Sequence, residues 1–143
     1  MSAEQAPCFV DTNVLVYAFE KGGSPKKLVA RRLVTELMDT DRLRLSTQVL
    51  QELFVTLTRK ADVRCSGEEA LGVLEDLAAW PLTVVDFPVI RAAAELSGKA
   101  TLSFWDSLVV ISASKSGSSV LYTEDLNHGQ EILGVRIANP FTA

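Results

Sequence analysis

Hydrophobic and polar positions follow two alternating patterns along this chain. Short runs that favour β-structure mark strands at residues 9–10, 43–46, 82–85, 120–122 and 135–137. The longer segments between them carry apolar residues at every third or fourth position, which is typical of helices packed on one face. Strands that alternate with helices indicate a parallel sheet covered on both faces. The pattern therefore predicts one α/β domain over residues 1–143.

Local end signals place the helices between those strands. Ser24 followed by Pro25 predicts an N-cap and a first turn, and Ser66 with Glu69 has the spacing of a capping box. Gly98 is expected to close the helix that begins near residue 86. The helices are therefore expected over about 24–38, 47–59, 66–78, 86–98 and 103–117. In the third, the positions expected to face inward are Leu71, Leu74, Leu77 and Ala78.

Four acidic residues lie beside apolar segments, where a carboxylate loses solvation. Asp11 follows the first strand, Asp125 follows the fourth, and Glu52 and Asp106 lie on helices. A lone buried carboxylate becomes neutral, whereas several that converge are usually held by a divalent cation with oxygen ligands. Strands and the helices that follow them meet at one edge of a parallel sheet. All four acids can therefore reach one rim.

Each of these acids also has an ordinary structural explanation. Asp11 can cap the helix that follows it, and Asp106 can be the third-position acid of a capping box begun by Ser103. Glu52 can be a solvated residue on an amphipathic helix, and Asp125 can belong to an Asx turn. Taken singly, these explanations weigh at least as much as metal binding. Metal binding is favoured only because all four acids can reach the same edge of the sheet.

Composition narrows the function classes without choosing one. Hydrophobic residues make up 48% of the chain and charged residues 22%, as in a soluble globular protein. The formal charge of −4 argues against a broad basic face for nucleic acid, but not against an enzyme acting on it. With His128 as the single histidine, a metal-free ribonuclease that uses two histidines is excluded. No Gly-rich loop follows the first strand, so nucleotide-binding folds are disfavoured.

The expected cellular compartment follows from features that the sequence does not contain. No apolar run reaches the ~18 residues of a membrane-spanning helix, and the first seven residues do not resemble a secretory signal. Cys8 and Cys65 suggest neither a disulfide framework nor a zinc site. We therefore expect a cytoplasmic protein with no membrane segment.

Several residues outside the acids are candidates for contact with nucleic acid. Two tryptophans, Trp80 and Trp105, are able to stack on bases, although Trp105 is expected in the core because its helix starts with apolar residues. His128 is expected to be a solvated loop residue. Two basic clusters are more simply explained as exposed helix faces. They are Lys26, Lys27, Arg31 and Arg32 on one helix, and Arg59, Lys60 and Arg64 further on.

Four segments resemble the motifs of PIN-domain ribonucleases, specifically the VapC toxins of bacterial toxin–antitoxin pairs. They occur in the family's order as FVDTNVLVYAF at 9–19, STQVLQEL at 46–53, LSFWDSL at 102–108 and LYTEDLNHG at 121–129. The similarity extends to 139–141, and its departures, Ser107 and Leu53, leave the acids intact. The resemblance implies a three-layer PIN-like fold with a five-stranded parallel sheet in the order 3-2-1-4-5, which places the first and fourth strands side by side.

The resemblance also implies roles for individual residues. The family's acidic quartet corresponds to Asp11, Glu52, Asp106 and Asp125, and its supporting polar positions to Asn13 and Thr123. The hypothesis is that the three aspartates bind Mg²⁺ or Mn²⁺, while Glu52 completes the shell or orients the attacking water. Glu124 neighbours the fourth acid, but the Thr-x-Asp spacing favours Asp125. The expected reaction is RNA hydrolysis that leaves 5′-phosphate and 3′-hydroxyl ends.

The leading hypothesis is therefore a metal-dependent endoribonuclease that is the toxin of such a pair. The resemblance implies an RNA substrate, a small antitoxin whose peptide lies near the site, and a homodimer. A housekeeping PIN nuclease is one alternative. Another is a phosphatase with Asp11 as covalent nucleophile, which Asn13 disfavours because that chemistry usually has a second acid there. A third is a non-catalytic interaction module.

Overall fold

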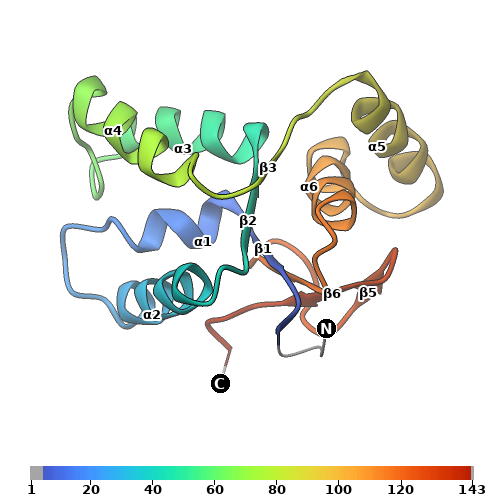
Figure 1. Cartoon of the computed structure of the whole chain (residues 1–143), viewed down its shortest axis with the longest axis horizontal. Coiled ribbons are helices and arrows are strands. Elements are labelled where there is room, and N and C mark those ends of the chain that lie inside the picture. The colour runs from blue at the N-terminus through green and yellow to red at the C-terminus, as the bar shows by residue number, and fades with distance from the viewer. Residues whose placement is uncertain (1–4, 143) are drawn as a thin grey trace.

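A mixed sheet of six strands forms the centre of the molecule in the computed structural model, which describes residues 5–142 (Figure 1). Its order is β3-β2-β1-β4-β6-β5. The strands are β1 Cys8–Val10, β2 Leu43–Ser46, β3 Leu82–Thr83, β4 Val120–Tyr122, β5 Glu131–Ile132 and β6 Val135–Ala138. All neighbours are parallel except β5 and β6, which form an antiparallel hairpin.

The expected order 3-2-1-4-5 is confirmed for the five parallel strands, but the expected count of five was too low. The additional strand, β5, has only two residues, too few to show an alternating pattern. The hairpin turns through Leu133 and Gly134, both with positive φ (51° and 77°), as in the two-residue turns that suit a hairpin's twist. The strand expected through Val85 is also shorter, because β3 ends at Thr83 and Val84 is 61% exposed.

Helices connect the strands, and most of them start at the residues that the sequence indicated. They are α1 Thr12–Tyr17, α2 Pro25–Asp39, α3 Thr47–Arg59, α4 Gly67–Leu77, α5 Phe87–Lys99 and α6 Phe104–Lys115. Ser24 caps α2, and Ser66 and Glu69 form the expected capping box on α4. Gly98 does not end α5, which continues to Lys99. The glycine is therefore tolerated inside the helix, at a modest cost in helix propensity.

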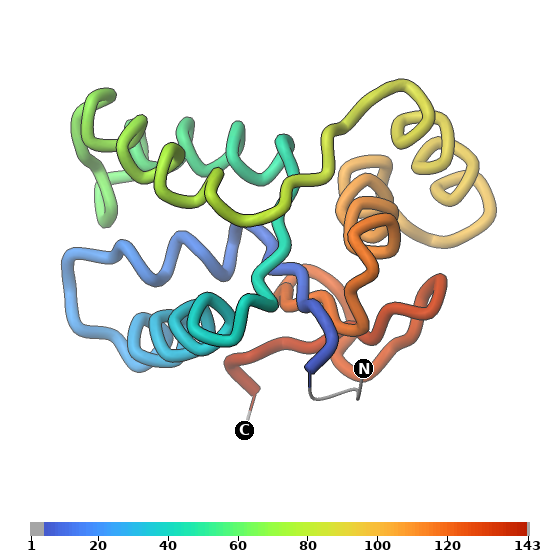
Figure 2. The backbone as a smooth tube through the Cα atoms, in the orientation of Figure 1, coloured from blue at the N-terminus to red at the C-terminus, as the bar shows by residue number. Residues whose placement is uncertain are grey.

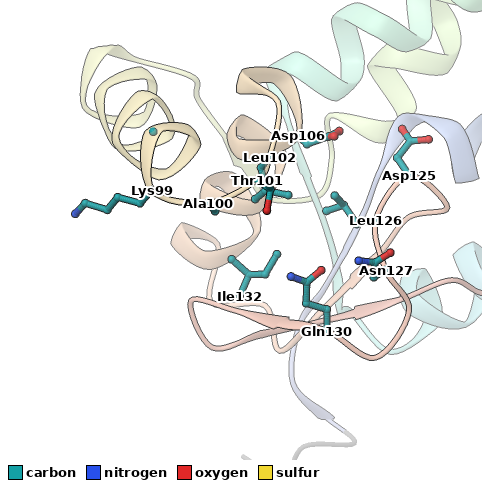
Figure 3. Close-up of a pocket in the computed structure, with 11 residues that line it drawn as sticks. Lys99, Ala100, Thr101, Leu102, Asp106, Asp125, Leu126, Asn127, Gln130 and Ile132 are labelled. Atoms are coloured by element: carbon teal, nitrogen blue, oxygen red, sulfur yellow. The ribbon is translucent and has the colours of Figure 1, made fainter.

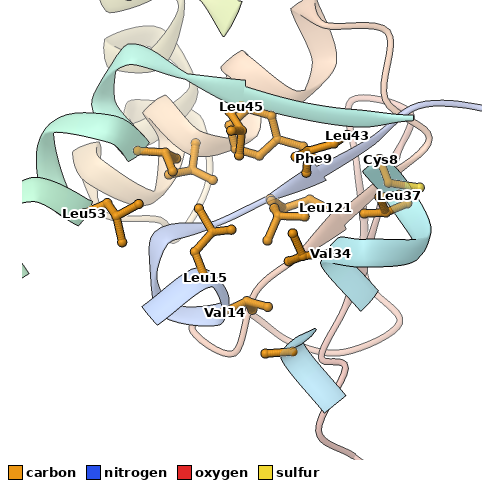
Figure 4. Packing of buried hydrophobic residues seen from close by; sticks show 14 of the residues in the cluster. Cys8, Phe9, Val14, Leu15, Val34, Leu37, Leu43, Leu45, Leu53 and Leu121 are labelled. Atoms are coloured by element: carbon orange, nitrogen blue, oxygen red, sulfur yellow. The ribbon is translucent and has the colours of Figure 1, made fainter. Parts of the chain in front are cut away.

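The helices form two layers around the central strands. Helices α1 to α4 lie on one side and α5 and α6 on the other, an arrangement that is visible in both the ribbon and the backbone trace (Figures 1 and 2). Phe9 on β1, Leu45 on β2 and Leu121 on β4 are fully buried between the layers, where Leu15 and Leu53 from α1 and α3 meet them (Figure 4). This core fixes the carboxyl ends of β1 and β4 side by side.

Some apolar positions on the helices face solvent, contrary to expectation. Leu71 is 50% exposed, because the main partner of α4 is the single helix α3. Leu77 is buried and Leu74 packs against the core, as expected, and α4 also buries Ala70. Ala78 is exposed as well. Trp105 is 65% exposed, so the expectation that it belongs to the core was wrong. Among the residues that the structure describes, no helix is long and apolar enough to cross a membrane.

Candidate active site

Asp11 is a buried carboxylate at the carboxyl end of β1. It is 6% exposed and serves as the N-cap of α1. Its Oδ1 accepts a hydrogen bond from the backbone N–H of Thr12 (2.7 Å), and its Oδ2 accepts one from the hydroxyl of Thr123 (3.0 Å). Burial raises the pKa of Asp11 to about 7 against the lowering effect of these bonds, and the charges of Glu52 and Asp125 raise it further. The carboxylate is thus fixed in position but costly to ionise.

Thr123 joins the ends of β1 and β4. The register pairs Val10 with Tyr122, so Asp11 and Thr123 leave their strands at the same level. The fully buried Thr123 hydroxyl donates to Asp11 and accepts from the backbone N–H of Asp125 (3.1 Å) and from Nδ2 of Asn13 (3.3 Å). One hydroxyl therefore positions Asp11 and the loop that carries Asp125.

Glu52 projects from α3 toward the same edge of the sheet. Its Oε1 accepts a hydrogen bond from the hydroxyl of Thr12 (3.1 Å). Partial desolvation raises the pKa of the Glu52 carboxyl, the bond from Thr12 lowers it, and the charges of Asp125 and Asp106 raise it. The role of Thr12 was missed in the sequence, because a contact between residues 40 positions apart leaves no local pattern.

Asp106 and Asp125 approach the rim from opposite sides of a cleft of about 660 Å³ (Figure 3). Asp106 lies in the first turn of α6, where its backbone N–H is capped by the hydroxyl of Ser103 (3.0 Å). Its carboxylate has no hydrogen bond to any described residue, so the second half of a capping box does not form. Asp125 lies in the loop after β4 and is exposed.

A second cleft of about 300 Å³ contains the remaining acids. Asp11, Glu52 and Asp125 all line it, so Asp125 is common to both clefts. The fold thus gathers the four predicted acids along one rim, with Asp106 coupled electrostatically to Glu52. Within residues 5–142, however, no three acidic, cysteine or histidine side chains lie close enough to form a ready-made metal site. An ion that used three of these acids would have to draw their side chains together.

Glu124 is oriented differently from its neighbour Asp125. Its Oε1 accepts a hydrogen bond from the Tyr17 hydroxyl (2.8 Å), and its Oε2 forms an ion pair with Nζ of Lys26 (3.1 Å). Nζ of Lys26 also lies over the rings of Tyr17 and Phe141, 4.9 and 5.2 Å from their centroids. This arrangement, which we call the Glu124 clamp, neutralises that carboxylate and leaves Asp125 as the unpaired acid of the two.

The other sequence candidates serve a mixture of roles. His128 lines neither cleft, and its Nδ1 accepts a hydrogen bond from the backbone N–H of Asn139 (3.0 Å). In the first basic cluster, Lys26 belongs to the clamp and Arg31 donates to the carbonyl of Ala18 (2.9 Å). In the second, Lys60 lines the cleft that holds Asp11. A cation at the C-cap of α3 therefore lines the same cleft as these acids.

Comparison with protein families identifies the domain. The family model described as PIN domain matches residues 8–130. The chain belongs to the PIN domain family. The match covers the β1, α3, α6 and β4 segments that carry the four acids. Among curated proteins, none matches the sequence significantly.

Solved structures share the fold of this PIN domain at low sequence identity. The Mycobacterium tuberculosis toxin VapC20, described as cleaving the sarcin–ricin loop, has a TM-score of 0.64 at 20% identity, over 82% of this chain and 89% of that one. A toxin–antitoxin complex from Klebsiella pneumoniae has a TM-score of 0.70 at 15% identity, over 95% and 99%. DNA-bound VapBC from Salmonella typhimurium has a TM-score of 0.64 at 20% identity, over 94% and 98%.

Proposed function

We propose that this PIN domain protein is a metal-dependent endoribonuclease that hydrolyses RNA phosphodiester bonds. The observation that carries the proposal is the environment of Asp11. Its carboxylate is buried and fixed by two hydrogen bonds, and it shares a cleft with Glu52 and Asp125. An arrangement of acids that repel one another is costly unless a cation compensates for it. A protein that needed Asp11 only as a helix cap would not need the other acids beside it.

The donor set fits a hard divalent cation. Carboxylate oxygens are the ligands that Mg²⁺ and Mn²⁺ prefer, and an ion would keep Asp11 ionised near neutral pH, although burial raises the pKa of this carboxyl to about 7. We assign the ligand positions to Asp11, Asp106 and Asp125. The last two have carboxylates without hydrogen bonds to described residues, so they are free to turn toward an ion. Such an ion, when bound, activates water and neutralises charge on the phosphate.

The remaining residues orient this set. Thr12 holds one oxygen of Glu52, which leaves the other oxygen to orient a water molecule or to complete the coordination. Through their hydrogen bonds, Thr123 and Asn13 hold Asp11 and the loop that carries Asp125 in fixed positions relative to each other. Residues that hydrogen-bond to metal ligands keep those ligands correctly oriented, and their mutation typically lowers metal affinity 10–100-fold. We expect products with 5′-phosphate and 3′-hydroxyl ends.

We further propose that the protein is the toxin of a toxin–antitoxin pair that acts on RNA in the cytoplasm. Two of the similar structures contain such pairs, one described as a toxin–antitoxin complex and the other as VapBC. The corresponding partner here is a small antitoxin protein, and the corresponding assembly is a homodimer. Co-expression of a candidate antitoxin with the chain, followed by co-purification and rescue of growth, tests this role separately from catalysis.

The phosphatase alternative is weakened by the surroundings of Asp11. The position beside it where that chemistry usually has a second acid is Asn13, whose Nδ2 donates to the Thr123 hydroxyl and whose Oδ1 accepts from the backbone N–H of Glu124. Failure to trap an aspartyl-phosphate at Asp11 would agree with this reading.

The decisive experiment is cleavage of a defined RNA pool with Mg²⁺, with Mn²⁺ and with excess chelator, followed by sequencing of the product ends. We expect cleavage only with metal. Asp11→Asn should reduce the rate at least about 100-fold, because it removes a direct ligand rather than a supporting residue. Gln5→Ala, an exposed change in the segment before β1, is the matched control. Equal cleavage in excess chelator would refute the metal mechanism.

A further inference from the structure

The cleft between Asp106 and Asp125 continues well beyond the acids. One wall is the connection between α5 and α6, from Lys99 to Leu102. The other is the loop after β4 together with the start of the hairpin, and its lining residues are Leu126, Asn127, Gln130 and Ile132. Figure 3 shows the two carboxylates at one end and these two walls leading away from them. At about 660 Å³, the cleft is within the usual range for a small-molecule site.

The lining of this extension is neutral apart from Lys99. Among the described residues, Lys99 is the one cationic residue that lines the cleft, and its side chain extends away from the other labelled residues (Figure 3). The side-chain amides of Asn127 and Gln130 are exposed and have no hydrogen bond to any described residue, so each offers a donor and an acceptor. Leu102, Leu126 and Ile132 add aliphatic surface. This chemistry suits a flat heterocycle with polar edges better than a second phosphate.

The wall that carries the amides is held by backbone hydrogen bonds. The N–H of Gly129 donates to the carbonyl of Ile137 on β6, and the N–H of Ile137 donates to the carbonyl of Gln130, both at 2.8 Å. The N–H of Gln130 also donates to the carbonyl of Asn127 (3.1 Å). Gly129 has a φ of 87°, which few other residues adopt without strain. The backbone that carries the two amides is therefore fixed, which lowers part of the entropic cost of binding.

We propose that this extension is a subsite for one unpaired nucleobase adjoining the scissile phosphate. Asn127 and Gln130 bond the polar edge of the base, and the aliphatic residues contact its face. Only a base outside a duplex presents that edge and face together. The subsite gives the enzyme a preference for particular bases next to the cut. The inference rests on the proposed ribonuclease function, because the scissile phosphate would be held by a cation bound to the acids at its end.

The first test compares cleavage of an RNA pool randomised around the scissile bond. Asn127→Ala and Gln130→Ala should each relax the preference at one position next to the cut about tenfold, the size expected for losing a bidentate base contact. The preference at other positions and the Mn²⁺ affinity should stay unchanged. Gln5→Ala, which removes an exposed amide outside the cleft, should match the wild type at every position.

The second test measures binding without catalysis. In an Asp11→Asn background, fluorescence anisotropy of four eight-residue homopolymeric RNAs should rank the bases in the order found by cleavage, and Asn127→Ala should compress that ranking. If Asn127→Ala and Gln130→Ala still cleave RNA with the wild-type base preference and bind the four RNAs in the wild-type order, the subsite is wrong while the proposed function stands. If those variants instead bound a hexaarginine peptide more weakly, the cleft would belong to a protein partner, and the subsite would again be wrong.

A wild type that leaves the RNA pool uncut with either metal contradicts the proposed function itself. The anisotropy measurement still decides the subsite in that case, because it needs no cleavage. A ranking of bases that depends on Asn127 would support the subsite even then, whereas equal binding of all four homopolymers would overturn it.

Discussion

Thr123 is the single residue on which most of the candidate site depends. Its buried hydroxyl uses its one donor on Asp11 and accepts two hydrogen bonds, from Asp125 and Asn13. A hydroxyl with three partners has no unused capacity, so any replacement without a hydroxyl leaves at least one buried polar group unsatisfied. Neither a helix cap nor an Asx turn, the ordinary explanations for these acids, requires such a network.

Thr123→Val should therefore destabilise the protein and weaken its metal site together. We expect a loss of roughly 2 kcal/mol in the free energy of unfolding, since valine keeps the shape but removes the hydroxyl. Mn²⁺ affinity should fall about 10–100-fold. Urea unfolding and calorimetric Mn²⁺ titration measure the two effects, and Thr123→Ser, which retains the hydroxyl, is the control. Wild-type Mn²⁺ affinity in Thr123→Val would contradict the supporting role.

The raised pKa of Asp11 predicts a pH dependence for the metal-free protein. The folded state binds a proton at Asp11 up to about pH 7, whereas an unperturbed aspartate releases it near 3.8. Between these values the folded state holds more protons than the unfolded state, so the free energy of unfolding should fall as pH rises. At about 1.4 kcal/mol per pKa unit, Asp11 can lower the free energy of unfolding by at most roughly 4 kcal/mol over this range.

Urea unfolding from pH 4 to pH 8 in chelator measures this decline. Saturating Mg²⁺ or Mn²⁺ should reduce it, because a bound ion favours the ionised carboxylate in the folded state. Asp11→Asn should remove the contribution, since its side chain does not titrate. A slope that is the same in wild type and Asp11→Asn would show that Asp11 titrates normally.

At the scale of elements, the Glu124 clamp ties α1, α2 and the loop after β4 to the C-terminal segment. Tyr17, Lys26 and Phe141 come from three parts of the chain and meet around one carboxylate. An exposed ion pair contributes little to stability. Its more important effect is to occupy the carboxylate of Glu124, which lines the same cleft as Asp11 and Asp125.

Lys26→Met should therefore change metal binding more than stability. Freed from its cation, Glu124 is able to compete for the ion or to displace the Asp125 loop, and the apparent Mn²⁺ affinity should change several-fold while thermal unfolding changes little. Adding Glu124→Gln should restore the wild-type affinity, because the competing charge is gone. An affinity change that persists in the double variant would show that Lys26 acts on the site in some other way.

Sequence patterns predicted the elements well wherever a local signal exists. The serine N-caps of α2 and α4 depend on neighbouring residues, so they are readable from the sequence. Leu71 and Trp105 were misplaced because the sequence does not say how many neighbours will cover a helix. Both lie on helices that are covered on part of their surface and open elsewhere. Strand β5 was not predicted, because its two residues are too few to show an alternation of apolar and polar positions.

At the scale of the whole molecule, the site depends on topology that spacing alone does not encode. Nothing local relates Asp11 to Asp125, which are 114 positions apart. The motif resemblance supplied the strand order that makes β1 and β4 neighbours, and the sheet has that order. The bond from Thr12 to Glu52 was not predictable, because it depends on how α1 packs against α3.

Because the acids come from the junction of β1 and α1, from α3, from α6 and from the loop after β4, an ion that joins them should stabilise the entire fold. At an ion concentration 100 times the dissociation constant, the gain is about 2.7 kcal/mol. We expect the melting temperature to rise with Mn²⁺, to return in chelator, and to rise less in Asp125→Asn. Asp76→Asn, an exposed change on α4 away from the rim, should respond as the wild type does. Equal shifts in both variants would contradict a site at Asp125.

The exposure of Trp105 gives the molecule an internal optical probe. Its indole is 65% exposed, rests edge-on against Phe104 and directly precedes Asp106 in the first turn of α6. The chain's other tryptophan, Trp80, lies before β3 and is half-buried. Paramagnetic Mn²⁺ near Asp106 should quench the emission of Trp105, whereas diamagnetic Mg²⁺ should not, and Trp105→Phe should abolish the difference. Arrival of an ion can then be followed in the unlabelled protein by its own fluorescence.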